Sequence, residues 1–393
     1  MASLVVVAVA VVAGLAMAWA LGASSNSPPF APAVGANAIG TMRAAFFIGV
    51  FAGLGAVAQG GSISETVGTE LIRNVPITPL AAVAGLLTAA AFIVAGVRTG
   101  YPIPAAFAVT GAMVGVGLSL GGDPAWGTYR RVVTFWALVP PVSGGIAYGT
   151  ASLLRHEDVP ETVGVPLLGA LVGAILANIE LGVVPGPGAQ NSVAGSASVA
   201  AGESGLGPVA VLVTLAIAAA GFGLLRREMV ADVDRGIRQF LVGLGAIVAF
   251  SSGGSQVGLA TGPLETLFAD LGAPGIILLA LGGTGILLGA WMGSPRLLQA
   301  VSREYSTLGV RRSIAALVPG FIIAQTAILL GIPISFNNII ISSVVGSGLA
   351  AGSGGVSRRK IGVTLGAWLA TLAAAIAVGF ALYRVLALIP GAA

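Results

Sequence analysis

Residues 331–338 read GIPISFNN and place a glycine, a proline and three polar side chains inside an otherwise apolar part of the chain. Residues 100–107, which lie 231 positions earlier, read GYPIPAAF. The same shift aligns residues 22–32 with residues 253–263. The aligned identities are Gly22 with Gly253, Ser24 with Ser255, Pro32 with Pro263, Gly100 with Gly331, Pro102 with Pro333, Ile103 with Ile334, Gly115 with Gly346 and Gly117 with Gly348. Paired prolines in one unbroken register indicate an internal repeat, whereas single glycine matches are common in this glycine-rich chain.

The composition of the chain is that of a polytopic membrane protein. Of its 393 residues, 56% are hydrophobic and only 8% are charged, whereas about a quarter of the residues in a soluble domain are charged. The absence of cysteine excludes disulfides, cysteine-ligated metal sites and thiol catalysis. The net charge of +4 is dispersed between apolar runs instead of forming one basic face, so nucleic-acid binding is not expected.

Twelve apolar stretches reach or approach the length of about 20 residues that a helix needs to cross a bilayer. They are residues 3–21, 43–60, 77–97, 102–120, 131–154, 165–184, 206–225, 239–252, 274–293, 311–331, 333–350 and 362–389. The stretch 239–252 is short, and 311–331 runs almost directly into 333–350, so these are candidates for broken helices or hairpins. The long polar stretches, 155–164 and 185–205, have the composition of loops.

The repeat predicts an inverted architecture. The shift carries the first stretch onto the eighth and the fourth onto the eleventh, which is a displacement of seven crossings. Because seven is odd, two copies related in this way must be inverted in the membrane. We therefore predict an all-α protein of about 12 transmembrane helices, with five-span repeats in residues 1–154 and 239–393 joined by two spans in residues 155–238.

Four segments are expected to break the spans near the middle of the membrane: residues 22–36, 253–263, 100–104 and 331–338. Non-helical or re-entrant backbone is tolerated at that depth only when it is buried in protein or lines a wet cavity. Inverted repeats of broken helices are a recurring plan of secondary transporters, which hold the substrate and the coupling ion at the breaks. Each segment taken alone could also be an ordinary surface loop.

The distribution of basic residues predicts the orientation. Cytoplasmic loops carry an excess of Lys and Arg, and 14 of the 18 such residues fall in the odd-numbered loops. The remaining four are Arg73, Arg130, Arg131 and Arg384. We therefore expect a multi-pass protein of the plasma membrane with both termini outside. No Lys or Arg precedes the first apolar run, which favours a span over a cleaved signal peptide.

The sequence resembles the inorganic phosphate transporter (PiT) family, whose members are sodium- or proton-coupled phosphate symporters and, in a few cases, sulfate permeases. The family signature Gly-Ala-Asn-Asp-x-Ala-Asn occurs twice, and each copy is followed about 80 residues later by Gly-Leu-Pro-Val-Ser-Thr-Thr-His. Residues 22–28 (GASSNSP) and 250–259 (FSSGGSQVGL) match the signature positions, and residues 100–107 and 331–338 match the later motif. The resemblance covers residues 1–154 and 239–390.

The polar letters of the signature differ from those of the family. The family's aspartate falls at Ser25 in the first copy and at Gln256 in the second, and neither side chain can ionise. The family's Thr-Thr-His has become Ala105-Ala106-Phe107 in the first copy and Phe336-Asn337-Asn338 in the second.

Neutral polar side chains gather at the expected breaks and are the candidate substrate-binding residues. They are Ser24, Ser25, Asn26, Ser27, Ser255, Gln256, Ser335, Asn337 and Asn338. Neutral donors and helix N-termini can hold an oxyanion. Sulfate is fully ionised at neutral pH and suits such a site as well as phosphate does. The alternative is that these side chains only cap helices or bond to neighbouring backbone.

Coupling requires an ion or proton carrier, and no other cofactor is expected. Glu65 is the first candidate for proton coupling, although it follows the end of a span and exposure at the interface is the alternative. Sodium bound by the neutral oxygens of Asn337 or Gln256 is the other possibility. No metal-ligand cluster, Walker sequence or hydrolase arrangement is present, so we expect no enzyme.

We therefore expect a secondary transporter of an inorganic oxyanion, phosphate by family default, working by alternating access in a lipid bilayer. The alternatives are a sulfate permease, a non-transporting membrane scaffold or sensor, and an ion channel. The sequence leaves the oligomeric state open, with a homodimer among the states considered.

Overall fold

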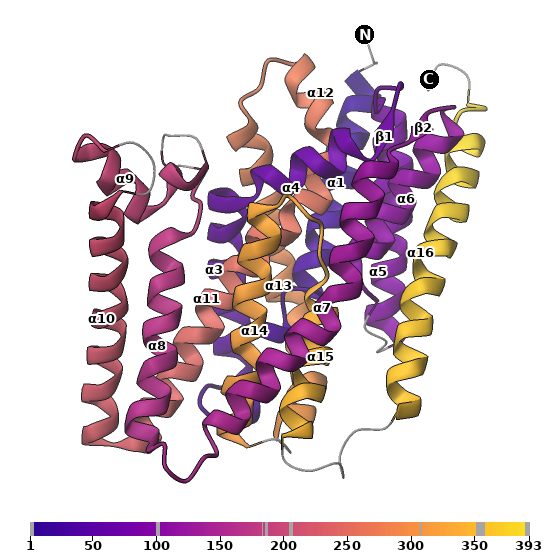
Figure 1. The fold of residues 1–393 in the computed structure, drawn as a ribbon. Helices are drawn as coiled ribbons and strands as arrows, with labels where there is room; N and C mark the ends of the chain where they lie inside the picture. Colours follow the sequence, from indigo (N-terminus) through magenta and orange to yellow (C-terminus); the bar gives the residue numbers. More distant parts are fainter. Residues whose placement is uncertain are drawn as a thin grey trace.

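The computed structural model describes residues 4–99, 103–182, 184, 188–203, 207–306, 309–350 and 358–389. Helices run side by side along a common direction and form one elongated bundle (Figure 1). In the described part of the chain, ten helices are long and apolar enough to cross a membrane. They lie in α1 (Leu4–Ala23), α3 (Thr41–Gln59), α5 (Pro79–Thr99), α7 (Trp126–Leu153), α8 (Glu161–Asn178), α10 (Pro208–Ala231), α11 (Val233–Thr261), α13 (Gly275–Ser306), α14 (Val310–Leu329) and α16 (Arg358–Leu386).

Two further apolar helices are shorter: α6 (Ala105–Ser119) and α15 (Phe336–Leu349). Each of the twelve apolar stretches in the sequence therefore contains one helix, which confirms the prediction of an all-helical polytopic membrane protein. The short stretch 239–252 is the middle of α11, which has 29 residues. Its amphipathic first turns, which include Asp234, Arg235 and Arg238, hid its true beginning from a search for purely apolar residues.

The remaining elements are short. Those of the first half are η1 (Pro28–Phe30), α2 (Ala31–Gly35), α4 (Gly61–Glu65), the π-helical turn η2 (Thr66–Glu70), β1 (Ile72–Arg73) and β2 (Asp123–Pro124). The later ones are η3 (Gly188–Asn191), α9 (Val193–Ala200), η4 (Gly262–Leu264) and α12 (Glu265–Asp270). β1 and β2 pair antiparallel, with Ile72 opposite Pro124 and Arg73 opposite Asp123.

The helices α6 and α15 are too short to cross a bilayer. They contain 15 and 14 residues, which at a rise of about 1.5 Å per residue gives only about 22 Å of the roughly 30 Å hydrocarbon core. A non-helical segment, residues 331–335, precedes α15, and all five of its residues are buried. The corresponding residues 100–102 lie outside the described part of the chain. The break expected at 331–338 is therefore present at 331–335, and Phe336, Asn337 and Asn338 begin the helix.

Gly331 ends α14. Its φ of +61° is in the left-handed region that glycine adopts without strain. The Gly331 N–H donates to the Ile328 carbonyl at 3.1 Å, and the Ile332 N–H donates to the Ala327 carbonyl at 2.8 Å. This pair of bonds is a Schellman cap. Pro333 then disfavours helical backbone at Ile332, and α15 begins at Phe336.

The other expected break pair is present in only one copy. α1 ends at Ala23, residues 24–27 form a buried turn, and η1 and α2 follow. Residues 253–261 of the second copy, in contrast, continue α11, and the interruption is confined to η4. Reading 253–263 as a break was thus wrong for most of its length. The reason is packing, because a Cβ on Gly253 would collide with the Ala52 carbonyl of α3, so glycine serves close helix contact here.

Helix packing follows the 231-residue register of the sequence. α1 packs against α13, and its counterpart α11 packs against α3. In the same way α6 packs against α16, and its counterpart α15 packs against α7. The aligned glycines lie at corresponding contacts, since a Cβ on Gly115 would collide with the Ile376 carbonyl and one on Gly346 with the Gly144 carbonyl.

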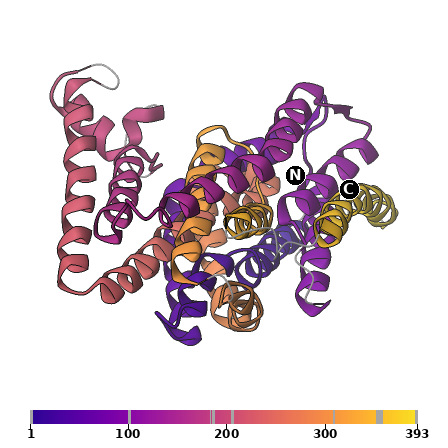
Figure 2. The same ribbon diagram turned by 60° about the horizontal axis from the view of Figure 1, so that its bottom comes forward.

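The helices α8, α9 and α10 stand at one side of the bundle in both ribbon views (Figure 1 and Figure 2). Gly169 and Gly221 bring α8 and α10 close together. The stretch 185–205 was expected to be a loop, yet residues 193–200 form α9. The Ser192 hydroxyl caps this helix by accepting from the Gly195 N–H at 3.0 Å.

The beginning of α1 and the end of α16 lie at the same end of the bundle (Figure 1). Which end faces the outside of the cell stays a prediction from the charge distribution.

Candidate functional site

Two interrupted segments meet at the continuous helix α11. The Ser252 hydroxyl of α11 donates to Asn26 Oδ1 in the turn after α1, at 2.5 Å. One helical turn further along the same face, Gln256 Nε2 donates to the Ile334 carbonyl in the non-helical segment 331–335, at 2.9 Å. The turn 24–27, the middle of α11 and the segment before α15 are therefore neighbours.

The fourth segment joins them through the ends of the two short helices. Asn337 Nδ2, at the start of α15, donates to the Ile103 carbonyl just before α6, at 3.1 Å. Trp136 of α7 holds the same region by donating Nε1 to the Pro333 carbonyl at 2.7 Å. Its ring stacks on Phe107, with ring centroids 3.9 Å apart. The structure thus brings together all four regions that the sequence singled out.

All nine candidate side chains are buried. Ser25, Asn26, Ser27, Ser255 and Gln256 are completely inaccessible to solvent, and the other four are exposed by no more than 7%. A surface-loop interpretation of these residues does not fit that burial. Their polar atoms must therefore find partners within the protein or in a bound species.

Four of the nine side chains have partners that account for their burial. The Ser24 hydroxyl donates to the Ala20 carbonyl at 2.8 Å, and Asn26 both accepts from Ser252 and donates to the Leu21 carbonyl. The Ser27 hydroxyl donates to Ser294 Oγ of α13 at 2.9 Å. The Ser255 hydroxyl donates to the Ser252 carbonyl at 3.1 Å. These bonds fix the conformation of the turn 24–27 and its position against α11 and α13.

Four other side chains carry a buried oxygen without a hydrogen-bond partner in the described part of the chain. They are Ser25 Oγ, Gln256 Oε1, Ser335 Oγ and Asn338 Oδ1. Each such group costs about 1–3 kcal/mol when it is left unsatisfied. The Asn337 amide donates to the Ile103 carbonyl, so it connects the starts of α6 and α15 instead of facing a ligand with that hydrogen. The unsatisfied oxygens mark where a polar ligand would be stabilised.

The orientation of the Gln256 amide follows from its contact. The Ile334 carbonyl can only accept, so the group that faces it must be the Nε2 amide, and Oε1 is left as a free acceptor. A free carbonyl-type oxygen suits a cation such as sodium and not an anion. The hydroxyls of Ser25 and Ser335 can donate as well as accept. The set therefore offers oxygens for a cation and hydroxyl donors for an anion.

Sequence reasoning missed a polar network next to this site. Gln59 of α3 donates to the Glu180 carbonyl at 2.9 Å and to Gln325 Oε1 of α14 at 3.0 Å. Gln325 Nε2 donates in turn to Ser251 Oγ of α11 at 2.7 Å. Burial raises the pKa of the Glu180 carboxyl by desolvation. The available signal was Gln325, the only amide side chain in the largely apolar stretch 311–331, and the same rule that selected Asn337 applies to it.

Glu65 differs from the buried candidates in its exposure. It ends α4 and is exposed, so its role as the coupling acid stays a prediction. Glu265, which was not among the residues predicted from the sequence, begins α12 and is only partly exposed. Its Oε2 has no hydrogen-bond partner among the described residues. Glu265 is therefore the second acidic candidate on this side of the bundle.

The comparisons with known proteins agree with this architecture. The model of the phosphate transporter family matches residues 21–379, so the chain belongs to that family. A protein of Thermococcus kodakarensis named as a phosphate permease is 26% identical over 97% of this chain and 98% of its own length. The inorganic phosphate transporter 2-1 of the Arabidopsis thaliana chloroplast is 24% identical, covering 91% of this chain and 68% of the relative.

A solved structure shares the fold. The structure of the sodium-dependent phosphate transporter matches 98% of this chain and 100% of its own, with a TM-score of 0.85 and 23% sequence identity. The resemblance to the inorganic phosphate transporter family is thereby confirmed, and the chain belongs to a family of transporters and not of enzymes.

Proposed function

We propose that this chain is a secondary active transporter of inorganic phosphate, working by alternating access with a co-transported cation. The observation that carries the proposal is the set of four unsatisfied buried oxygens where segments from both halves of the chain meet. Membership of the phosphate transporter family supports phosphate as the substrate.

The two short helices favour an anion between them. Their first residues, Ala105 and Phe336, adjoin the Ile103–Asn337 contact, so two helix N-termini converge there. Each N-terminus carries free N–H groups and the positive end of a helix dipole. Two such ends repel each other unless negative charge lies between them. Ser335, which precedes α15 and has an unsatisfied hydroxyl, adds a donor at the same place.

The directions of these helices support two inverted repeats, in residues 1–154 and 239–393, joined by residues 155–238. α6 ends beside β1, where Gly117 faces Ile72, near the beginning of α7. α15 ends beside the other end of α7, where Arg155 donates to the Ala350 carbonyl at 2.5 Å. From a common starting point the two helices thus run to opposite ends of the bundle, as two inverted copies require.

Sodium is the coupling ion that the site suits best. Gln256 Oε1 and Asn338 Oδ1 are buried acceptors of the hard-oxygen type that sodium prefers. The similar solved protein is named as sodium-dependent, which agrees with this choice. Proton coupling through Glu65 or Glu265 is the alternative, and the same experiment separates the two.

Sulfate is the second candidate substrate because none of the nine buried side chains is ionisable. A site without a carboxylate accepts a fully ionised anion without having to share a proton with it.

The test is uptake of labelled phosphate and labelled sulfate into proteoliposomes, each with and without an imposed sodium or proton gradient. We expect phosphate to accumulate above equilibrium under the sodium gradient. Accumulation of sulfate instead would support the alternative substrate, and accumulation under the proton gradient alone would move attention to Glu65 and Glu265. If neither anion moves under any gradient, the transport proposal fails and a scaffold or sensor role gains support. Flux that runs only downhill and does not saturate would indicate a channel.

A further inference from the structure

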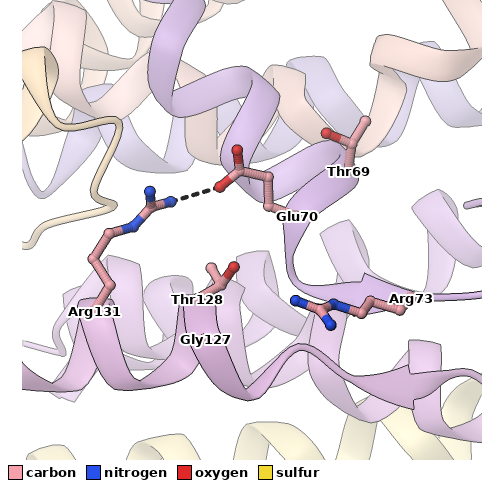
Figure 3. A pocket seen from close by; sticks show the side chains of 6 residues that line it. All are labelled: Thr69, Glu70, Arg73, Gly127, Thr128 and Arg131. Atoms are coloured by element: carbon pink, nitrogen blue, oxygen red, sulfur yellow. Dashed lines mark hydrogen bonds and ion pairs between the residues drawn. The ribbon is translucent and has the colours of Figure 1, made fainter.

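A second polar site lies at the end of the bundle where α1 begins. A cavity of about 420 Å³ opens there between η2, β1 and the first turns of α7 (Figure 3). It is lined by Thr69, Glu70, Arg73, Gly127, Thr128 and Arg131. None of these residues belongs to the buried site described above.

The lining carries two guanidinium groups and one carboxylate. Arg131 Nη2 and Glu70 Oε2 form an ion pair at 2.5 Å. Arg73 forms no ion pair with an acid in the described part of the chain. The acid opposite it in the strand pair, Asp123, accepts instead from Asn74 Nδ2 at 2.6 Å. The cavity therefore holds one neutralised and one unneutralised arginine, and its net charge is positive.

Arg73 reaches into the cavity over Gly127. Its Nη2 atom lies 3.9 Å from the position that a Cβ on Gly127 would occupy, which places the guanidinium beside the first turn of α7. Figure 3 shows the Arg73 side chain pointing toward Thr128 on the floor of the cavity, with Glu70 and Arg131 on the opposite side. Guanidinium groups bind tetrahedral oxyanions through paired N–H donors, and a threonine hydroxyl adds a further donor.

The two walls of the cavity both contact the segment that leads to the buried site. On one wall Glu70 Oε2 also accepts from Thr66 Oγ1 at 3.3 Å, and Thr66 Oγ1 lies 3.0 Å from where a Cβ on Gly331 would be. On the other wall α7 carries Trp136, which donates to the Pro333 carbonyl. Two elements that form the cavity, η2 and α7, thus also reach the segment from Gly331 to Pro333 through Thr66 and Trp136.

Basic residues are otherwise rare at this end of the protein. The charge distribution assigns only Arg73, Arg130, Arg131 and Arg384 to the end of the bundle that carries the termini, and two of these four line the cavity. Positive charge at a mouth raises the local concentration of an anion and its rate of association.

We propose that this cavity is an outer docking site for the substrate oxyanion, held by Arg73 and Arg131 with Thr128, before the anion passes to the buried site. The docking step rests on the proposed transport function. Glu70 competes with the anion for Arg131, so an arriving oxyanion replaces the carboxylate on that guanidinium.

The test compares the kinetics of R73Q and R131Q with those of R130Q in the proteoliposome uptake assay. Arg130 is a matched control because it adjoins Arg131 on α7, is exposed and does not line the cavity. We expect R73Q and R131Q to raise the KM for phosphate about three- to tenfold with kcat unchanged, because each removes charge-assisted hydrogen bonds to the docked anion. The KM of R130Q should stay within about twofold of the wild type, because an exposed charge outside the cavity acts only through screened long-range attraction. The same KM in all three variants would overturn the proposal.

The variant E70Q tests the competition directly. Removing the carboxylate should lower the KM for phosphate, and a raised KM would overturn the role of Glu70 as a competitor. If the wild type transports neither phosphate nor sulfate, the proposed function fails separately from the docking site. Equilibrium binding of labelled phosphate to the solubilised protein then tests the docking site by itself. We expect the double variant R73Q/R131Q to lose binding that R130Q retains. Equal binding by the two variants would overturn the docking site.

Discussion

The residues that decide this site are neutral. Ser25 and Gln256 occupy the positions where the family signature has an aspartate, and both are completely buried. Their side chains keep the location of the signature but not its charge. Each leaves one oxygen unsatisfied, Oγ in Ser25 and Oε1 in Gln256. Such oxygens lower the free energy of unfolding of the ligand-free protein, and a bound ligand that pairs with them offsets this loss.

Replacing Ser25 with alanine should separate stability from transport. The variant removes an unsatisfied hydroxyl, so we expect the free energy of unfolding to stay unchanged or to rise by about 1 kcal/mol. The KM for phosphate should rise about fivefold, because a neutral hydrogen bond to the anion contributes about 1 kcal/mol. The control is S24A, whose hydroxyl already donates to the Ala20 carbonyl at 2.8 Å. Uptake by S25A with the wild-type KM would contradict its role.

Replacing Gln256 with alanine should weaken the apparent affinity for sodium. The change removes the free Oε1 and also the bond that holds Ile334. We expect the sodium concentration for half-maximal uptake to rise about tenfold, which corresponds to about 1.4 kcal/mol. S255A is the matched control, since its hydroxyl bonds only within α11. A sodium dependence equal to that of S255A would remove Gln256 from the cation site.

At the scale of the element, the interruptions work because particular residues end the helices. Gly331 closes α14 with a left-handed turn, and Pro333 keeps the residue before it out of the helical conformation. The interrupted backbone is held by side chains from other helices, namely Gln256 from α11 and Trp136 from α7. α6 and α15 are therefore short for two reasons. The residues that flank them end the helix, and hydrogen bonds from other helices stabilise the non-helical backbone that results.

The variant G331A should destabilise the protein more than G309A does. Both glycines have positive φ, so each alanine costs about 1 kcal/mol of backbone strain. A Cβ at 331 would also lie 3.0 Å from Thr66 Oγ1, whereas nothing lies within 4 Å of a Cβ at 309. Thermal unfolding in detergent measures the difference. Equal melting temperatures would show that the turn has room for the methyl group.

Close contact between helices of the two halves predicts a second difference. A Cβ on Gly346 would meet the Gly144 backbone, while Gly149 on α7 has open space. G346A should therefore lower stability by about 1–3 kcal/mol, which is typical of overpacking, and G149A should raise it by up to about 1 kcal/mol through helix propensity. Chemical unfolding followed by circular dichroism distinguishes the two. A loss of stability in G149A would contradict the packing at α7 described above.

At the scale of the whole molecule, the absence of cysteine makes the orientation directly measurable. The exposed residues Leu271 and His156 lie in loops at opposite ends of the bundle, after α12 and after α7. In intact cells a membrane-impermeant maleimide should label L271C, which is at the end that carries the termini. It should label H156C only after permeabilisation. The reverse pattern would place both termini inside.

Much of the fold was predictable because membrane spans are recognised by runs of apolar residues and a repeat by identical residues at a constant spacing. The twelve helices follow from apolar length, and the 231-residue shift follows from paired glycines and prolines. The segment 253–263 was misread because glycine has two uses that look alike in a sequence. At Gly331 it permits a positive φ, and at Gly253 it permits contact with Ala52 within a continuous helix.

The sequence by itself determined that the chain crosses a membrane many times, and it predicted that its two halves repeat. It also singled out the neutral polar residues that the structure shows to be buried. Only the tertiary structure decided which of those side chains hydrogen-bond to neighbouring groups and which keep an oxygen without a partner. Asn337 illustrates the first case and Gln256 Oε1 the second. It also brought Arg73 and Arg131, from β1 and α7, to one cavity. The physical reason is that apolar periodicity is local, whereas a hydrogen-bond partner or an ion pair depends on contacts between residues far apart in the chain.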